Sequence, residues 1–203
     1  FGDAVCLLPL DKPLDRRRVD LDKGSYPYTC LAEPKGKRVF VSLWGKAAVA
    51  VIDRDEGKVV ATWKTKSHPT EMALTPDGKT LFVACSNSTQ VSVLDAAHNG
   101  DALETINCAL YPGAPSGNTP NSLCLTPDGE LLFVANADAN NLAVFKVSEP
   151  GKSQPLGFIP VGWYPTSVRY DAHDKRLYVA NGKGLTSRAN PQGPGPHNNR
   201  KFN

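Results

Sequence analysis

Four short segments of the sequence place polar side chains at matching distances from a proline. The prolines are Pro27, Pro69, Pro120 and Pro165. If the segments are equivalent units of a stack, these side chains lie at one height and form a polar site for an anion or a sugar. Each candidate ligand-binding residue stands directly before a repeat proline, or two or four residues after one. The candidates are Tyr26, His68, Glu71, Thr119, Ser122, Tyr164, Ser167 and Arg169.

The same residue types also serve simpler purposes, because polar side chains cap strand ends and fill a water-lined channel. His68 and Glu71 are near enough in sequence to act as an acid–base pair, but no nucleophile accompanies them. The sequence contains no Gly-x-Ser-x-Gly, His-Glu-x-x-His or phosphate-loop motif. We therefore predict no catalytic residue within this segment.

Metal and cofactor chemistry has little support in the sequence. His68, His98, His173 and His197 are dispersed, and no Cys-x-x-Cys pair accompanies them. We expect no metal site and no cofactor in this segment. The number and spacing of the cysteines do not indicate whether the protein lies in an oxidising or a reducing compartment. The five cysteines cannot all pair within one chain, and the apolar runs around Cys30, Cys85 and Cys124 favour buried free thiols, with at most one disulfide.

The elements that must position the candidate site form an internal repeat. Fourteen residues after the four prolines stand Val41, Val83, Val134 and Val179, each directly after an aromatic residue. Within one unit, residues 71–74, 80–84, 90–94 and 103–109 read as short strands separated by turns such as Pro-Asp-Gly at 76–78. Four antiparallel strands in 40 to 50 residues are typical of a propeller blade rather than of a solenoid or sandwich.

Composition agrees with this interpretation. The 203 residues include 17 Gly and 17 Pro, which argues against a helical bundle, and 40% are hydrophobic, which argues against disorder. The net charge of +3 comes from four basic residues without an acidic one after residue 181, so the rest carries −1 and nucleic-acid binding is disfavoured. No run of 18 apolar residues exists, so no membrane span is expected.

We therefore predict an all-β protein with about four propeller blades. Residues 1–25 form the end of a preceding blade or a lead-in, and residues 26–184 form a partial propeller. Its blades are residues 26–67, 68–118, 119–163 and an incomplete 164–184, followed by a flexible Pro/Gly/Asn-rich tail at 185–203. Because blades pack on their neighbours, the remaining blades of a larger ring are expected as partners.

Several motifs resemble the YVTN-repeat (YncE-like) family of bacterial β-propellers. They are Phe-Val-Ala-Cys-Ser at 82–86, Phe-Val-Ala-Asn-Ala at 133–137, Tyr-Val-Ala-Asn-Gly at 178–182, Val-Ala-Val-Ile-Asp at 49–53 and Pro-Asp-Gly-Lys at 76–79. The resemblance covers residues 26–182 and implies a seven-bladed ring. Leu43 and Cys85 depart from the asparagine found at Asn136 and Asn181, which puts a repeated ring of asparagine hydrogen bonds in doubt.

A narrower resemblance concerns residues 158–166, 180–185 and 187–194. These segments are similar to a subgroup in which such a propeller is joined to an alkaline-phosphatase-like phosphoesterase domain. The resemblance implies a metal-dependent phosphoesterase as a further partner domain, and export to the periplasm or the cell exterior. No residue of this chain matches the metal site or the nucleophile of that domain.

Three functions follow as hypotheses. The first is a binding or scaffold module of a larger exported protein. The second is a lactonase-like hydrolase that uses the propeller channel. The third is a cell-surface interaction protein built from the same repeats. A convergent acid–base cluster in the channel would favour the hydrolase, whereas packing alone would favour the scaffold.

Overall fold

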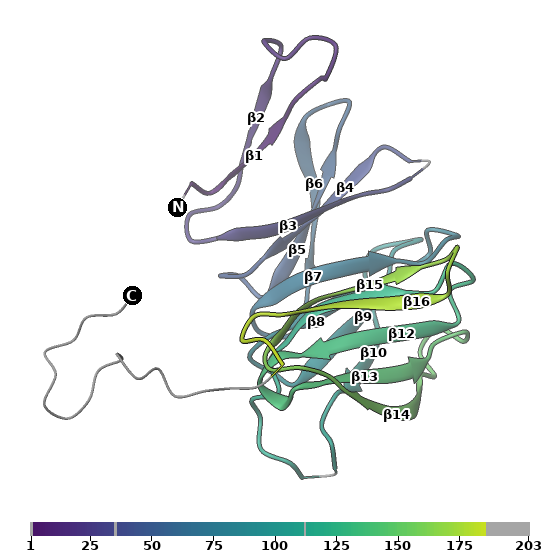
Figure 1. The fold of residues 1–203 in the computed structure, drawn as a ribbon. Helices are drawn as coiled ribbons and strands as arrows, with labels where there is room; N and C mark the ends of the chain where they lie inside the picture. The colour runs from purple at the N-terminus through teal and green to yellow at the C-terminus, as the bar shows by residue number, and fades with distance from the viewer. Residues whose placement is uncertain (1, 35, 112, 186–203) are drawn as a thin grey trace, which may run out of the picture.

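A computed structural model describes residues 2–34, 36–111 and 113–185 of the chain (Figure 1). The described residues form sixteen β-strands and one short 3-10 helix, so the chain is an all-β protein as the sequence predicts. The predicted tail at 185–203, apart from Leu185, lies outside the described residues, as do residues 187–194 of the narrower resemblance.

The strands form three four-stranded sheets and two two-stranded ones, and all pairings are antiparallel. The first hairpin is β1 (Ala4–Leu7) with β2 (Arg17–Asp20). The three complete sheets are β3 (Pro27–Ala32), β4 (Arg38–Leu43), β5 (Ala48–Asp53) and β6 (Lys58–Lys64); β7 (Pro69–Leu74), β8 (Thr80–Cys85), β9 (Gln90–Asp95) and β10 (Ala102–Asn107); and β11 (Pro120–Leu125), β12 (Leu131–Asn136), β13 (Asn141–Lys146) and β14 (Gln154–Pro160). The helix η1 (Ala137–Ala139) follows β12, and the last hairpin is β15 (Pro165–Asp171) with β16 (Arg176–Asn181).

Within each complete sheet the strands follow chain order, and short loops join consecutive strands. The Thr-Pro-Asp-Gly turn between β7 and β8 shows how the sequence makes one. The Thr75 hydroxyl lies 2.6 Å from Asp77 Oδ1, the same carboxylate accepts from the Lys79 amide at 3.0 Å, and Gly78 adopts φ +74°. The side chains therefore satisfy the turn's polar groups, and glycine supplies the left-handed backbone.

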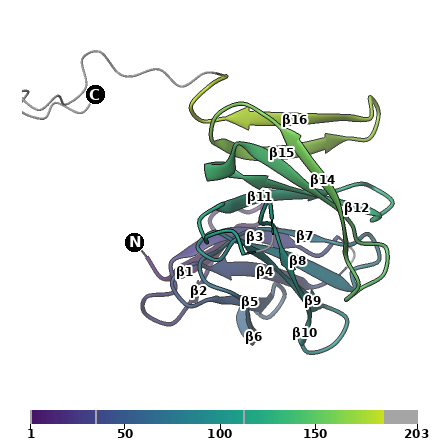
Figure 2. The same cartoon turned by 90° about the horizontal axis from the view of Figure 1, so that it is seen from below.

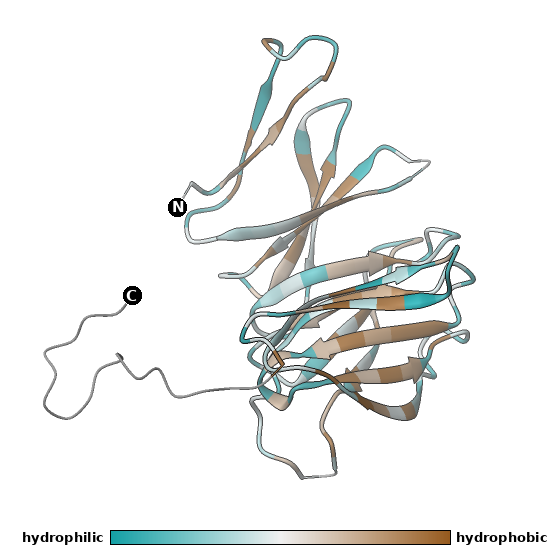
Figure 3. Cartoon of the chain, in the orientation of Figure 1, coloured by the Kyte–Doolittle hydropathy of each residue, from teal (hydrophilic) through white to brown (hydrophobic). Residues whose placement is uncertain are grey.

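Hydrophobic layers lie between consecutive sheets (Figure 3). Phe40 and Trp63 pack with Leu81 and Leu94 between the first and second complete sheets, with the Phe40 and Trp63 rings 5.4 Å apart. Gly100 in the second sheet approaches Trp63 so closely that a Cβ there would lie 2.0 Å from the indole. Burial of this kind is the main source of stability in a stack of blades.

The first strands of the sheets lie beside one another in the order β3, β7, β11 and β15. Figure 2 shows β11 between β7 and β15. These four inner strands carry the predicted site, since each begins at one of the repeat prolines.

The expectation that Cys30 is buried needs correction. Cys85 and Cys108 are buried, but Cys30 is exposed because it lies on the face of β3 that points away from the second sheet. All five cysteines are free thiols. Of the three tryptophans, Trp63 is buried, whereas Trp44 and Trp163 are 37% and 44% exposed.

Candidate ligand-binding site

The four residues before the repeat prolines share one backbone geometry. Tyr26, His68, Thr119 and Tyr164 have φ angles of 47°, 56°, 52° and 58°, in the left-handed region. In each sheet the carbonyl of this residue accepts a hydrogen bond from the residue after the second strand, as in Ser86 N to His68 O at 3.0 Å and Gly182 N to Tyr164 O at 2.8 Å. The repeat thus holds these residues at equivalent places.

The side chains of these four residues have separate surroundings. The rings of Tyr26 and His68 both contact Trp44, with centroid distances of 6.5 and 4.0 Å from the indole. Thr119 donates a hydrogen bond to Asp138. The four residues therefore do not converge on one ligand.

Tyr164 belongs to the last sheet. Its ring lies 4.6 Å below the Lys183 ammonium, and its amide donates to Asn140 Oδ1 at 2.8 Å.

Glu71, Ser122 and Arg169 do converge, although they come from three different sheets. The Ser122 hydroxyl donates to Glu71 Oε2 at 3.0 Å, and the guanidinium of Arg169 donates to both Glu71 oxygens, at 3.1 Å for Oε1 and 3.2 Å for Oε2. Ser122 Oγ also accepts from the Val168 amide at 3.1 Å and from Arg169 Nη1 at 3.3 Å. This cluster, called the inner-strand cluster below, connects β7, β11 and β15.

The two charged members of the inner-strand cluster are departures from the repeat. Where the other units carry Thr29, Ser122 and Ser167, the second carries Glu71. The position of Arg169 is apolar in the other units, where Leu31, Ala73 and Cys124 stand. Two departures of opposite charge that meet in space indicate a site with a specific role, either a clasp between blades or a ligand site.

Burial limits the chemistry that this cluster offers. Ser122 is fully buried, so its hydroxyl cannot reach a substrate as a nucleophile. Cys124 is also a poor nucleophile, because burial raises the pKa of its thiol to about 11. The Arg169 side chain is 57% exposed, against 22% for Glu71, so its guanidinium is the group that a soluble ligand meets. A guanidinium recognises planar carboxylates.

Two of the candidate residues lie outside the inner-strand cluster. His68 does not pair with Glu71, because its ring packs on Trp44 while Glu71 is held by Ser122 and Arg169. Ser167 is half-buried on β15 opposite Ala180 and is not a member of the inner-strand cluster.

Nothing in the repeat pattern distinguishes Tyr28, Trp44 or Asn140. Asn140 accepts a hydrogen bond from the Tyr164 amide, and Trp44 packs on His68. The sequence alone does not reveal such residues. An aromatic side chain that stacks on a ligand differs from one in the core mainly by its solvent exposure.

Among the described residues, no three or more His, Cys, Asp or Glu side chains gather closely enough to hold a metal ion. The same part of the chain contains no helix of the length and hydropathy that a membrane crossing requires.

A family model described as "Lactonase, 7-bladed beta-propeller" matches residues 32–186. Hydrazine synthase subunit beta of Kuenenia stuttgartiensis is 27% identical over 150 residues, which make up 72% of this chain and 29% of that protein. NHL repeat-containing protein 3 of Mus musculus is 35% identical over 153 residues, or 74% of this chain and 39% of that protein. The chain thus spans less than half the length of these curated relatives.

Solved structures agree on the fold. A protein from Lactobacillus plantarum superimposes with a TM-score of 0.75 at 23% identity, covering 88% of this chain and 57% of that one. The Pseudomonas aeruginosa periplasmic gluconolactonase gives a TM-score of 0.73 at 22% identity, covering 89% and 56%. Because both identities are below 25%, these likenesses concern the fold alone.

Proposed function

Since the chain belongs to the lactonase family of seven-bladed β-propellers, we propose that it forms the ligand-binding part of such a ring. The ligand is a small molecule with a carboxylate or lactone carbonyl, and it meets the inner-strand cluster. One observation carries this proposal: the two charged departures from the repeat, Glu71 and Arg169, meet across three neighbouring inner strands.

The geometry favours recognition of an oxygen-bearing group by Arg169. Its contacts with Glu71 and Ser122 fix the guanidinium in place before a ligand arrives, which lowers the entropy lost on binding. Because the charges of Glu71 and Arg169 cancel, the net charge of the pair is zero. This favours a ligand with one small polar group over a ligand with several charges. First strands of blades line the central channel of a propeller, so the ligand lies in that channel.

Lactone hydrolysis is the second candidate, and the family match favours it. In that reaction a water molecule adds to the lactone carbonyl, the ring C–O bond breaks, and a hydroxy acid forms. Glu71 is the only carboxylate of the inner-strand cluster and would take the proton of that water. Both its oxygens already accept hydrogen bonds, which favours binding over catalysis.

Calorimetry with D-gluconate and hydrolysis of D-glucono-1,5-lactone together separate the two candidates. We expect the 203-residue chain to bind gluconate, Arg169→Leu to weaken binding about tenfold or more, and Arg176→Leu to have no effect. Arg176 is the matched control, an exposed arginine on β16, the strand paired with β15. Absence of gluconate binding would overturn the proposal. Hydrolysis that Glu71→Gln abolishes would establish the second candidate instead.

We also propose a larger context, supported by the resemblance of residues 158–166 and 180–185 to the phosphoesterase-linked subgroup. In it the remaining blades and an alkaline-phosphatase-like domain are partners of this chain, and the protein is exported. The alternative is a cell-surface interaction protein. Hydrolysis of p-nitrophenyl phosphate with divalent metal tests whether catalysis belongs to the phosphoesterase domain and binding to this chain. Robust turnover by this chain alone would contradict a pure binding role.

A further inference from the structure

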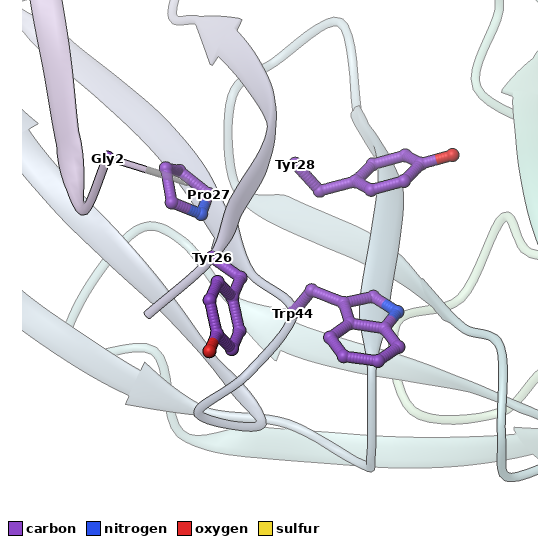
Figure 4. A pocket seen from close by; sticks show the side chains of 5 residues that line it. All are labelled: Gly2, Tyr26, Pro27, Tyr28 and Trp44. Carbon is purple, nitrogen blue, oxygen red and sulfur yellow. The ribbon is translucent and has the colours of Figure 1, made fainter. Parts of the chain in front are cut away.

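A second hollow lies apart from the inner-strand cluster, where β3 begins and β4 ends. Its lining is Gly2, Tyr26, Pro27, Tyr28 and Trp44, and its volume is about 390 Å³ (Figure 4). We call it the aromatic pocket. Its volume lies at the lower end of the range for small-molecule sites, which suits a ligand of about one ring.

The rings of the aromatic pocket are held in place yet open to solvent. The Trp44 ring contacts the rings of both Tyr26 and His68, at centroid distances of 6.5 and 4.0 Å, so residues from the first and second complete sheets together hold it. Gly45 permits this arrangement, because a Cβ there would come 2.2 Å from Gly24 O and 2.5 Å from the Tyr26 ring. Even so, Tyr28, Tyr26 and Trp44 remain 58%, 44% and 37% exposed. Grouped aromatic surface of this kind is typical of binding sites.

Polar atoms accompany the rings. The Tyr28 hydroxyl and the Trp44 indole nitrogen point toward the same side of the pocket (Figure 4). The His68 ring lies 4.0 Å from the Trp44 ring, and its buried Nδ1 has no hydrogen-bond partner among the described residues. The Asp3 carboxylate accepts hydrogen bonds from the amides of Gly24 and Tyr26 at 2.8 and 3.0 Å, which hold its pKa below the ordinary value.

From these observations we propose that the aromatic pocket binds a neutral pyranose sugar. The C–H face of a pyranose packs on an indole or phenol ring, and its equatorial hydroxyls bond to the surrounding phenol and indole N–H groups. Among the described residues, none that lines the pocket has a charged side chain. A nucleotide or an acidic sugar would therefore bring an anionic group without a cation to receive it.

The aromatic pocket is separate from the proposed channel site. His68, whose ring contacts Trp44, precedes Glu71 by three residues, or roughly 10 Å of extended chain. A single sugar ring on Trp44 therefore does not reach the inner-strand cluster. The proposal does not rest on gluconate binding or on lactone hydrolysis, and either can fail without affecting it.

Tryptophan fluorescence offers a direct test, with methyl β-D-glucopyranoside as the probe. Trp63 is buried, and Trp163 is exposed to a similar degree as Trp44 but lies outside the pocket, so the titration uses a Trp163→Phe background. We expect a saturable change with a Kd of about 1 mM, as for a small ligand with few contacts. Tyr28→Ala should weaken binding about tenfold, the effect of losing a stacking contact of about 1.4 kcal/mol.

Calorimetry of the unmodified chain and of Trp44→Ala checks the result without fluorescence, and circular dichroism verifies that each variant is folded. Tyr28→Phe keeps the ring and loses the hydroxyl, so it separates stacking from hydrogen bonding. The proposal is overturned if the glucoside produces no saturable signal, or if Tyr28→Ala and Trp44→Ala bind it as well as the unmodified chain. Tighter binding of D-gluconate than of the glucoside at this pocket would also overturn it.

Discussion

At the scale of single residues, Ser122 is the most connected member of the inner-strand cluster. Its hydroxyl donates to Glu71 and accepts from the buried Val168 amide. Ser122→Ala leaves that amide without a partner, so we expect the free energy of unfolding to fall by about 1–3 kcal/mol in urea denaturation. Ser167→Ala is the control, at the same position of the repeat but outside the cluster, and should change stability by less than about 0.5 kcal/mol. Equal effects of the two changes would argue against a bridging role.

The Glu71–Arg169 pair can be removed by restoring the residues of the other repeats. Because Arg169 is more than half exposed, the pair contributes about 0.2–1 kcal/mol, and Glu71→Thr with Arg169→Leu should leave stability nearly unchanged. Gluconate binding should disappear in this double variant. Loss of stability by several kcal/mol with binding retained would identify the pair as a clasp between blades instead.

At the scale of elements, the strands and turns were accessible from the sequence because each unit repeats its proline, its Pro-Asp-Gly turn and its aromatic–valine pair. The left-handed backbone of the residue before each proline could not be predicted from the sequence. Residues that precede proline normally favour extended backbone, yet Tyr26 and its three equivalents have positive φ. The hydrogen bond of each such carbonyl to the residue after the second strand stabilises the unusual geometry. Only tertiary contacts reveal it.

The inner-strand cluster was predictable in part, because its residues occupy regular positions of the repeat. Offsets from the prolines placed Glu71, Ser122 and Arg169 at one level, and the structure joins them. Side-chain direction is not part of the repeat pattern, however. His68 therefore turned out to face Trp44, and Ser167 proved to lie outside the cluster.

A link between two sheets gives a prediction about pH. Arg38 donates two hydrogen bonds to Glu33, at 3.1 and 2.6 Å, and one to the Ala96 carbonyl of the second complete sheet at 2.6 Å. The hydrogen bond from Arg38 is the largest of the effects that hold the pKa of Glu33 below its ordinary value. A lowered pKa means that this stabilisation is present above about pH 4.3 and is lost as the pH falls through the pKa of the folded state.

Glu33→Gln should therefore be less stable than the unmodified chain at about pH 7, and the difference should shrink toward about pH 3. Urea midpoints across this range provide the measurement. Glu56→Gln, which removes an exposed pairing with Lys58, should alter the midpoint little at any pH. A difference for Glu33→Gln that is independent of pH would show that the charge of Glu33 has no part in the link.

At the scale of the whole molecule, the sheets differ in their number of strands. The three middle sheets have four strands, whereas β16 pairs only with β15 among the described residues. In this part of the chain the outer edge of β16 has no paired strand, and Tyr178 on it is 54% exposed. Such an edge is a template for pairing with another strand.

We therefore expect the isolated 203-residue chain to self-associate through β16 at concentrations of about 100 μM, because a propeller blade with an open edge gains backbone hydrogen bonds from a second copy. Sedimentation velocity at increasing concentrations measures this association. Tyr178→Lys should shift the distribution toward monomer, since a lysine on an edge strand opposes pairing, whereas Tyr111→Lys, in a loop residue 59% exposed, should not. A stable monomer for the unmodified chain, or equal effects of the two lysines, would show that the β16 edge is not the contact.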